Sequence, residues 1–248
     1  MQQNLVAAQR LIVALDFKPT FPKGRDWMRE QVLTFAKGLK ETEVRCLKLE
    51  SLLRGDYSLI DDIHELGFQV FADLKLSGTK ETLSTDGILL KRYKPDFVSV
   101  MCGSGPTGMK ALKEELPETK ILGVTALTNL TDIDTRELYS GSVEEIVTRF
   151  GQAAKKAEIH GLISAPKEAR PLRMKFGHVL SLYAPAVRPT WANVSKDDQN
   201  PQRTMTPKEA VEAGVDYLIV GRPITEAENS RDAVTRIIEE IKTARYRP

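Results

Sequence analysis

The stretch DYLIVGR at residues 216–222 is a short apolar run that ends on a glycine and an arginine. Seven comparable runs precede it, and longer amphipathic segments separate them. The earlier runs are LIVALDF (11–17), VRCLKLE (44–50), FQVFADLKL (68–76), DFVSVM (96–101), KILGVTAL (120–127), GLISAP (161–166) and HVLSLYA (178–184). Strict alternation of short strands with helices predicts a parallel sheet, and eight such units can close into a barrel.

The segments between these runs have helical periodicity, as in GRDWMREQVLTFAKGLK (24–40) and RDAVTRIIEEIKTA (231–244). Two segments open on capping boxes, Ser142-x-x-Glu145 and Thr206-Pro207-x-Glu209, which mark the starts of helices. A length of 248 residues is ordinary for one α/β barrel. We therefore expect a single (β/α)8 TIM barrel domain over residues 1–248.

The structural alternative is a doubly wound open sheet. Dinucleotide-binding sheets of that kind carry a G-x-G-x-x-G turn after the first strand. This chain has DFKPTFPKG at residues 16–24 instead. The barrel is therefore the favoured arrangement.

The composition is that of a water-soluble protein. Hydrophobic residues make up 41% and charged residues 28% of the chain, and no apolar run is long enough to span a membrane. The formal net charge of +2 comes from mixed acidic and basic residues, which argues against nucleic acid as a partner. The first residues lack the pattern of a secretory signal, so we expect a cytoplasmic location.

The two cysteines and three histidines show no pattern typical of a disulfide or a metal site. Cys46 and Cys102 each lie within an apolar run, so we expect buried free thiols. His64, His160 and His178 lack metal-ligand spacing, and we expect structural roles for them. The sequence predicts neither a metal nor a cofactor.

Charged side chains end the first three apolar runs, and in a barrel the carboxyl ends of the strands face the active site. These residues are Asp16, Lys48, Glu50, Asp73 and Lys75. Asp73 and Lys75 lie two residues apart on one strand and therefore share a face. A buried lysine needs a carboxylate partner, which the interleaved charges supply. The cluster is either a catalytic centre or a structural ion-pair network.

The last strand ends at Gly221 and Arg222, where barrels commonly bind phosphate through the seventh and eighth loops. Arginine offers a planar fork to phosphate oxygens, and glycine lets backbone N–H groups approach an anion, although a surface ion pair is an alternative role for this arginine. The loop of residues 185–205 is long and polar, which is typical of a flap over a ligand. Its polar residues include Arg188, Asn193, Asp198, Gln199 and Arg203. We expect Trp191 of this loop to be a packing residue.

Taken together, these residues resemble the orotidine 5'-monophosphate decarboxylase family over nearly the whole chain. The matching segments are LIVALDF, CLKLE, FADLKL, PDFVSV, GVTALTN, APAVRP with DDQ, and AGVDYLIVGRPITEA. The resemblance implies a cofactor-free decarboxylation of orotidine 5'-monophosphate to UMP, a step of pyrimidine biosynthesis. It also implies a homodimer with shared active sites, because the family's Lys-Asp-Lys-Asp array takes its last aspartate from the other subunit.

The resemblance assigns roles to single residues. It implies that Lys48, Asp73 and Lys75 form the catalytic array, with Lys75 protonating C6 of the pyrimidine as CO2 leaves. Asp16 resembles the contact to the ribose hydroxyls, and Thr82 resembles a contact from the partner's side. The other substrate contacts implied are Thr128 and Asn129 for the pyrimidine, and Pro185, Arg188, Gln199, Gly221 and Arg222 for the phosphate and flap.

The chain departs from the family pattern Asp-x-Lys-x-x-Asp at the second aspartate, where it has Gly78. Without that carboxylate, Lys75 is expected to be held less firmly. The candidate replacement carboxylates are Glu81, Asp86 and Glu50. The further departures are Met101 in place of histidine, Glu50 in place of glycine and Asn129 in place of serine.

Two alternatives to an orotidine 5'-monophosphate decarboxylase stay open. Gly78 favours a non-catalytic protein that binds a phosphate or a nucleotide. A sugar-phosphate decarboxylase of the same superfamily is the weaker alternative, because those enzymes also resemble Asp-x-Lys-x-x-Asp and usually use a metal. Turnover and binding of nucleotides distinguish the three functions.

Overall fold

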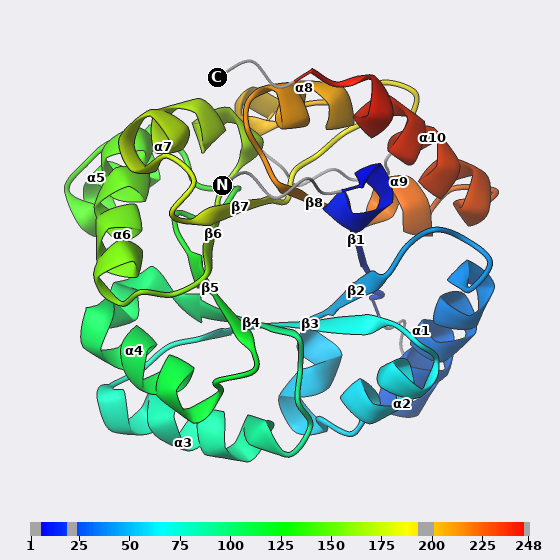
Figure 1. Ribbon diagram of the computed structural model, residues 1–248, viewed down its shortest axis with the longest axis horizontal. Helices are drawn as coiled ribbons and strands as arrows, with labels where there is room; N and C mark the ends of the chain where they lie inside the picture. The colour runs from blue at the N-terminus through cyan, green and yellow to red at the C-terminus, as the bar shows by residue number, and fades with distance from the viewer. Residues whose placement is uncertain (1–5, 19–23, 193–200, 246–248) are drawn as a thin grey trace.

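The computed structural model describes residues 6–18, 24–192 and 201–245, and its eight parallel strands form a closed barrel (Figure 1). The strands are β1 (Leu11–Ala14), β2 (Cys46–Leu49), β3 (Gln69–Leu76), β4 (Phe97–Met101), β5 (Lys120–Val124), β6 (Gly161–Ile163), β7 (Ser181–Ala184) and β8 (Tyr217–Val220). Each strand pairs with the next one in sequence, and β8 pairs with β1. The predicted (β/α)8 barrel is confirmed, and the open sheet is excluded.

Helices form a ring around the strands (Figure 1). The α-helices are α1 (Arg25–Leu39), α2 (Leu59–Glu65), α3 (Lys80–Lys91), α4 (Gly105–Glu115), α5 (Asp132–Tyr139), α6 (Val143–Lys156), α7 (Ala169–Phe176), α8 (Pro207–Glu212), α9 (Arg222–Thr225) and α10 (Ser230–Thr243). The short 3-10 helices are η1 (Ala7–Arg10), η2 (Ser51–Gly55), η3 (Cys102–Ser104), η4 (Pro166–Glu168) and η5 (Pro201–Arg203). In the described ranges, no helix is long and apolar enough to cross a membrane.

Both predicted capping boxes begin helices. At α6, the Ser142 hydroxyl accepts a hydrogen bond from the Glu145 N–H, and the Glu145 carboxylate accepts one from the Ser142 N–H. Thr206 and Glu209 make the same reciprocal pair at the start of α8. Each box satisfies N–H groups that the first turn of a helix leaves without a partner.

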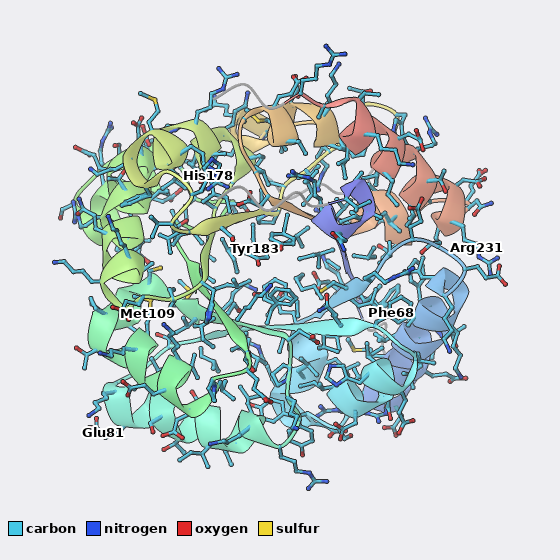
Figure 2. The ribbon with its side chains drawn as sticks, viewed as in Figure 1. Phe68, Glu81, Met109, His178, Tyr183 and Arg231 are labelled. Atoms are coloured by element: carbon cyan, nitrogen blue, oxygen red, sulfur yellow. The ribbon has the colours of Figure 1, made fainter. Side chains whose placement is uncertain are left out.

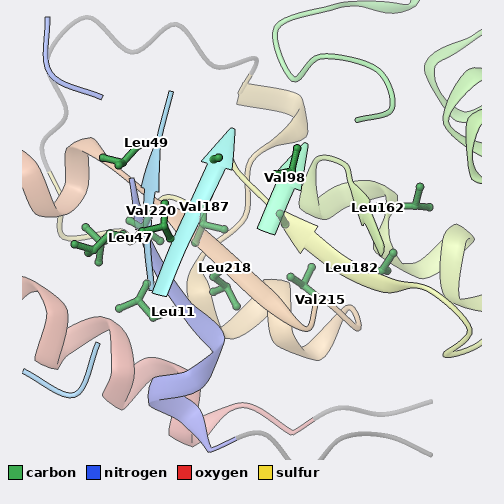
Figure 3. Close-up of a cluster of buried hydrophobic side chains, with 14 of the residues drawn as sticks. Leu11, Leu47, Leu49, Val98, Leu162, Leu182, Val187, Val215, Leu218 and Val220 are labelled. Carbon is green, nitrogen blue, oxygen red and sulfur yellow. The ribbon is translucent and has the colours of Figure 1, made fainter. Parts of the chain in front are cut away.

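The strands separate two apolar layers because successive side chains point to opposite faces of the sheet. Leu47 and Leu49 of β2 point outward and join the larger cluster between strands and helices, as do Leu218 and Val220 of β8 (Figure 3). Cys46 points into the barrel, where a smaller cluster fills the interior. Lys48 shares the inward face with Cys46, so the same alternation directs its side chain into the barrel.

Aromatic rings fill the middle of the barrel. Tyr183 and Tyr217 stack with ring centroids 4.4 Å apart, and the Phe97 ring meets both edge-on. Tyr183 lies inside the ring of strands, whereas Glu81 and Arg231 lie at the outer edge of the molecule (Figure 2). The interior is therefore packed below the charged residues, and the barrel is not an open channel.

Candidate active site

A cavity of about 560 Å³ opens at the carboxyl ends of the strands, a size that suits a small-molecule ligand. Its floor is the top of the interior cluster, where Ala14, Val124, Ile163 and Ile219 line it. The predicted site residues that line it are Asp16, Lys48, Asp73, Lys75, Thr128, Asn129, Pro185, Arg188, Gly221 and Arg222. The structure thus brings together ten side chains or backbone segments that the sequence predicts to meet.

Lys48 is the innermost charge of this cavity, and only 6% of its side chain is exposed. Its Nζ lies 2.7 Å from Asp16 Oδ2, 3.1 Å from Asp73 Oδ2 and 3.2 Å from Glu50 Oε2. Burial acts to lower the pKa of Lys48, but the three carboxylates outweigh burial and raise it above its ordinary value. Lys48 is therefore a fixed cation that holds three anions around it.

Asp73 is buried and shared by both lysines. Its Oδ2 contacts Lys48 Nζ at 3.1 Å and Lys75 Nζ at 2.9 Å, and its Oδ1 accepts a 2.7 Å hydrogen bond from the Ser99 hydroxyl. Burial acts to raise the pKa of Asp73, but the two lysines and Ser99 lower it to about 2. Asp73 is therefore ionised at neutral pH.

Lys75 stands at an irregular point of β3. The pairing of β3 with β4 shifts register between Ala72 and Leu76, and Lys75 has a φ of 50°, in the left-handed region. The Lys75 N–H donates a 2.8 Å hydrogen bond to Ser99 Oγ. The side chains of Asp73 and Lys75 meet as predicted, although the regular alternation behind that prediction breaks at Lys75.

Ser99 belongs to the charged cluster, although the sequence analysis does not single it out. It is fully buried on β4, where its hydroxyl accepts from the Lys75 backbone and donates to Asp73. A lone hydroxyl inside the apolar run DFVSVM is the signal that points to such a role, because a buried polar group needs a hydrogen-bond partner. Ser99 thereby fixes the backbone of one charged residue and the side chain of the other.

Asp16 completes the charged cluster at its outer edge. It follows β1, and 44% of its side chain is exposed to the cavity. Burial at the barrel mouth raises its pKa, although contact with Lys48 opposes that effect. Three carboxylates thus surround two ammonium groups, an excess of one negative charge.

The other predicted binding residues that line the cavity follow β5, β7 and β8. Thr128 and Asn129 follow β5, Pro185 and Arg188 follow β7, and Gly221 and Arg222 follow β8. A Cβ on Gly221 would make ordinary 3.5 Å contacts with Ala14, so packing within the chain does not itself demand glycine there. Gln199, with Asn193 and Asp198 of the predicted flap, lies outside the described residues.

Thr82 does not lie with the other predicted site residues. It occupies the first turn of α3, where its N–H donates to the side chain of the capping residue Thr79. Thr82 does not line the cavity of its own chain. Its predicted contact from the partner's side stays a prediction.

Two residues of the long loop have structural roles. Trp191 donates a 2.7 Å hydrogen bond to Glu240 Oε1, and the Arg236 guanidinium lies 3.9 Å from its ring centroid, which confirms the predicted packing role. Arg203 does not cover a ligand as a flap residue would. It is buried and pairs with Glu168 at 2.9 Å, because its guanidinium points into the protein.

The cysteines are buried free thiols, as predicted. Burial raises the pKa of Cys102 to about 12 and raises that of Cys46 as well, which disfavours the reactive thiolate. His64 lies 3.1 Å from Asp96, and the His160 ring accepts a hydrogen bond from the Ile121 N–H, as structural histidines do. No group of three metal-ligating side chains is arranged to hold a metal within residues 6–18, 24–192 and 201–245.

Known proteins resemble this chain along most of its length. The chain is 33% identical over 248 residues to the orotidine 5'-phosphate decarboxylase of Heliobacterium modesticaldum, which covers 95% of this chain and 96% of that protein. It is 33% identical over 236 residues to the Staphylococcus epidermidis enzyme of the same name, with 92% and 96% covered. The fold is that of the Lactobacillus acidophilus orotidine 5'-phosphate decarboxylase structure, with a TM-score of 0.77, 24% identity, and 95% and 100% coverage.

The family profile agrees with these similarities. The profile described as "Orotidine 5'-phosphate decarboxylase / HUMPS family" matches residues 9–237, which include all eight strands and the whole described cavity. With its barrel, its charged cluster and these relatives, the chain belongs to the orotidine 5'-phosphate decarboxylase / HUMPS family.

Proposed function

We propose that this chain converts orotidine 5'-monophosphate to UMP and CO2 without a cofactor, as a step of pyrimidine biosynthesis. The observation that carries the proposal is the 2.9 Å contact between Lys75 Nζ and Asp73 Oδ2 within the cavity. This contact places a proton donor beside a fixed carboxylate, as decarboxylation followed by protonation at carbon requires. Membership of the family supports this choice of substrate.

Asp73 and Lys75 have opposite tasks in the proposed reaction. The ionised Asp73 faces the substrate carboxylate, and the repulsion between the two anions is relieved as CO2 leaves. The bond from C6 to the carboxylate breaks, and its electron pair stays on C6. The Lys75 ammonium stabilises that charge and transfers a proton to C6, after which water reprotonates the Lys75 amine.

The rest of the cavity is proposed to hold the nucleotide. Asp16 contacts the ribose, and Lys48 holds Asp16 and Asp73 in place. Thr128 and Asn129 contact the pyrimidine from the loop after β5. The proposed phosphate contacts are Pro185, Arg188, Gly221 and Arg222, with Gln199 from the flap.

A homodimer with shared active sites is part of the proposal. Ile88 and Leu89 on α3 are each 57% exposed, and adjacent exposed apolar side chains favour an interface. The same helix carries Thr82, the predicted partner-side contact. Sedimentation of the wild-type protein is expected to show a dimer that the Ile88→Asp/Leu89→Asp double variant weakens. A monomer of the wild-type protein would contradict the proposed assembly.

The proposed cellular location is the cytoplasm. The buried free thiols of Cys46 and Cys102 suit a reducing compartment. Fractionation of cells is expected to recover the protein with other cytoplasmic enzymes, and recovery in a secreted fraction would contradict this location.

Turnover and binding test the proposed reaction together. Formation of UMP from orotidine 5'-monophosphate is measured with and without EDTA, beside calorimetric titration with UMP. We expect EDTA-resistant turnover that Lys75→Ala abolishes, while Lys110→Ala, a change at an exposed lysine of α4, keeps wild-type turnover. UMP binding without turnover would instead support a non-catalytic nucleotide-binding protein. Metal-dependent decarboxylation of a sugar phosphate would support the other alternative.

A further inference from the structure

We infer that Glu50 is a positioning residue for the decarboxylation, and that it holds the Lys75 ammonium from within the same chain. The inference rests on the proposed function. Glu50 Oε1 lies 2.8 Å from Lys75 Nζ, and Glu50 Oε2 lies 3.2 Å from Lys48 Nζ. One carboxylate therefore bridges both lysines, with a separate oxygen for each.

The inward register of β2 explains why Glu50 reaches this position. Cys46 and Lys48 face the barrel interior, and Glu50 lies two residues further along the same face. Its side chain is 28% exposed and lines the cavity. Glu50 lies two residues after Lys48, just as Lys75 lies two residues after Asp73. In each pair the two side chains carry opposite charges.

Lys75 shares its contact with Asp73 with the other lysine, Lys48. Both lysines contact the same oxygen of Asp73, Oδ2, while Oδ1 accepts from Ser99. Glu50 Oε1 lies 2.8 Å from Lys75 Nζ, whereas the other oxygen of that carboxylate, Oε2, is the one that approaches Lys48. Asp73 Oδ2 accepts a hydrogen bond from the Lys75 ammonium and Glu50 Oε1 forms an ion pair with it, so two carboxylates orient the group that transfers a proton to carbon.

The loop around Gly78 is built without a carboxylate. A Cβ at Gly78 would lie 2.8 Å from Thr82 Cγ2 and 2.9 Å from Thr82 Cβ, so any side chain there would displace Thr82. Neither Gly78 nor Thr82 lines the cavity of its own chain. Glu50, directly after β2, instead supplies a second carboxylate to Lys75 from within the same chain.

Three substitutions at Glu50 test the inference. Glu50→Gln keeps the size of the side chain and removes its charge, so kcat is expected to fall by about 100-fold while KM and the Kd for UMP change by less than about threefold. Glu50→Asp keeps the charge and is expected to stay within about tenfold of the wild-type kcat. Glu50→Gly is expected to regain activity when formate is added, but not when chloride is added at equal ionic strength, because formate restores a carboxylate.

The matched control is Glu41→Gln, which removes a glutamate that pairs with Arg231 on the surface. It is expected to leave kcat and KM unchanged. Wild-type kcat in Glu50→Gln, beside an inactive Lys75→Ala, would overturn the inference. Equal losses of kcat and UMP affinity, without rescue by formate, would also overturn it, because they would indicate a merely structural role.

A measurement that needs no turnover separates this inference from the proposed function. The rate at which an amine-specific reagent modifies Lys75 is followed by peptide mass spectrometry in the wild type and in Glu50→Gln. We expect at least a threefold faster modification in the variant, because the Lys75 amine then has one carboxylate contact fewer to restrain it. An unchanged rate would overturn the inference even if the wild type forms UMP. A wild type that forms no UMP would overturn the proposed function, while this rate would still decide whether Glu50 holds Lys75.

Discussion

Arg203 Nε lies 2.9 Å from Glu168 Oε1, and this buried ion pair joins the loop after β7 to the loop after β6. The Arg203 guanidinium also donates to the carbonyl oxygens of Ala126, Leu127 and Leu130 in the loop after β5. Three loops that surround the cavity are therefore fastened to one side chain. The turn that carries Thr128 and Asn129 lies directly over this anchor.

Replacement of Arg203 is expected to loosen this arrangement. Arg203→Met leaves a buried carboxylate and several carbonyl groups without their donor, and we expect a loss of about 3–5 kcal/mol in the free energy of unfolding. Urea denaturation measures this change. Arg231→Met breaks the exposed pair with Glu41 and should cost only about 0–1 kcal/mol. Equal effects of the two substitutions would show that Arg203 is not an interior anchor.

Because Asp73 is ionised in the folded protein, the free energy of unfolding is expected to fall at acidic pH. The pKa of Asp73 is about 2 in the folded protein and 3.8 ordinarily. Its contribution to the free energy of unfolding is therefore present above pH 3.8 and is lost as the pH falls through 2. The shift corresponds to about 2 kcal/mol, of which roughly half is lost by pH 3. Urea denaturation between pH 6 and pH 3 is expected to show a steeper decline in the wild type than in Asp73→Asn. Parallel declines would contradict the lowered pKa.

Arg222 is expected to recognise the phosphate group and not the nucleoside. A charged hydrogen bond to phosphate contributes about 1.5–3 kcal/mol, so Arg222→Ala should weaken UMP binding by about 10- to 100-fold. Uridine binding should stay unchanged. Calorimetric titration with both ligands tests this, with Arg92→Ala as a control that removes an exposed arginine at the end of α3. An equal loss of uridine affinity would show that Arg222 supports the cavity in another way.

Two glycines offer a matched test of the packing. A Cβ at Gly161 on β6 would lie 2.6 Å from the backbone oxygen of Ser181, whereas a Cβ at Gly38 in α1 meets nothing within 4 Å. Gly161→Ala is expected to destabilise the protein by about 1–3 kcal/mol, because the clash is with backbone. Gly38→Ala should stabilise the protein by about 0.5–1 kcal/mol, through helix propensity. Thermal unfolding of both variants checks the signs, and a stabilised Gly161→Ala would contradict the close approach of β6 and β7.

The sequence predicts the barrel well because the barrel depends on local patterns. All eight apolar runs form strands, but the strands are shorter than the runs; the run 161–166, for example, contains the strand Gly161–Ile163. Residues just past the ends of β1, β2, β5, β6, β7 and β8 line the cavity, whereas Asp73 and Lys75 lie within β3. The position of a residue within its apolar run therefore predicts whether its side chain reaches the cavity. The residue at which a strand ends depends on the neighbouring strand with which it pairs.

The details of the site depend on contacts between distant segments, which the sequence does not reveal. The left-handed Lys75 needs Ser99, which lies on the next strand, to hold its backbone. Arg203 looks like a flap residue until its buried partner Glu168 is known. Glu50 is one of three candidate carboxylates in the sequence, and the structure places it in contact with both lysines.

The origin of the cavity residues has a consequence for redesign. The charged side chains come from β1 to β3 and the residues just after them, whereas Arg188, Gly221 and Arg222 follow β7 and β8. In the proposed reaction, the residues that carry the chemistry and the residues that recognise the phosphate are therefore separate in the sequence. Exchange of the loops after β7 and β8 is therefore expected to change which anionic group the cavity accepts, while the charged cluster of β1 to β3 stays intact.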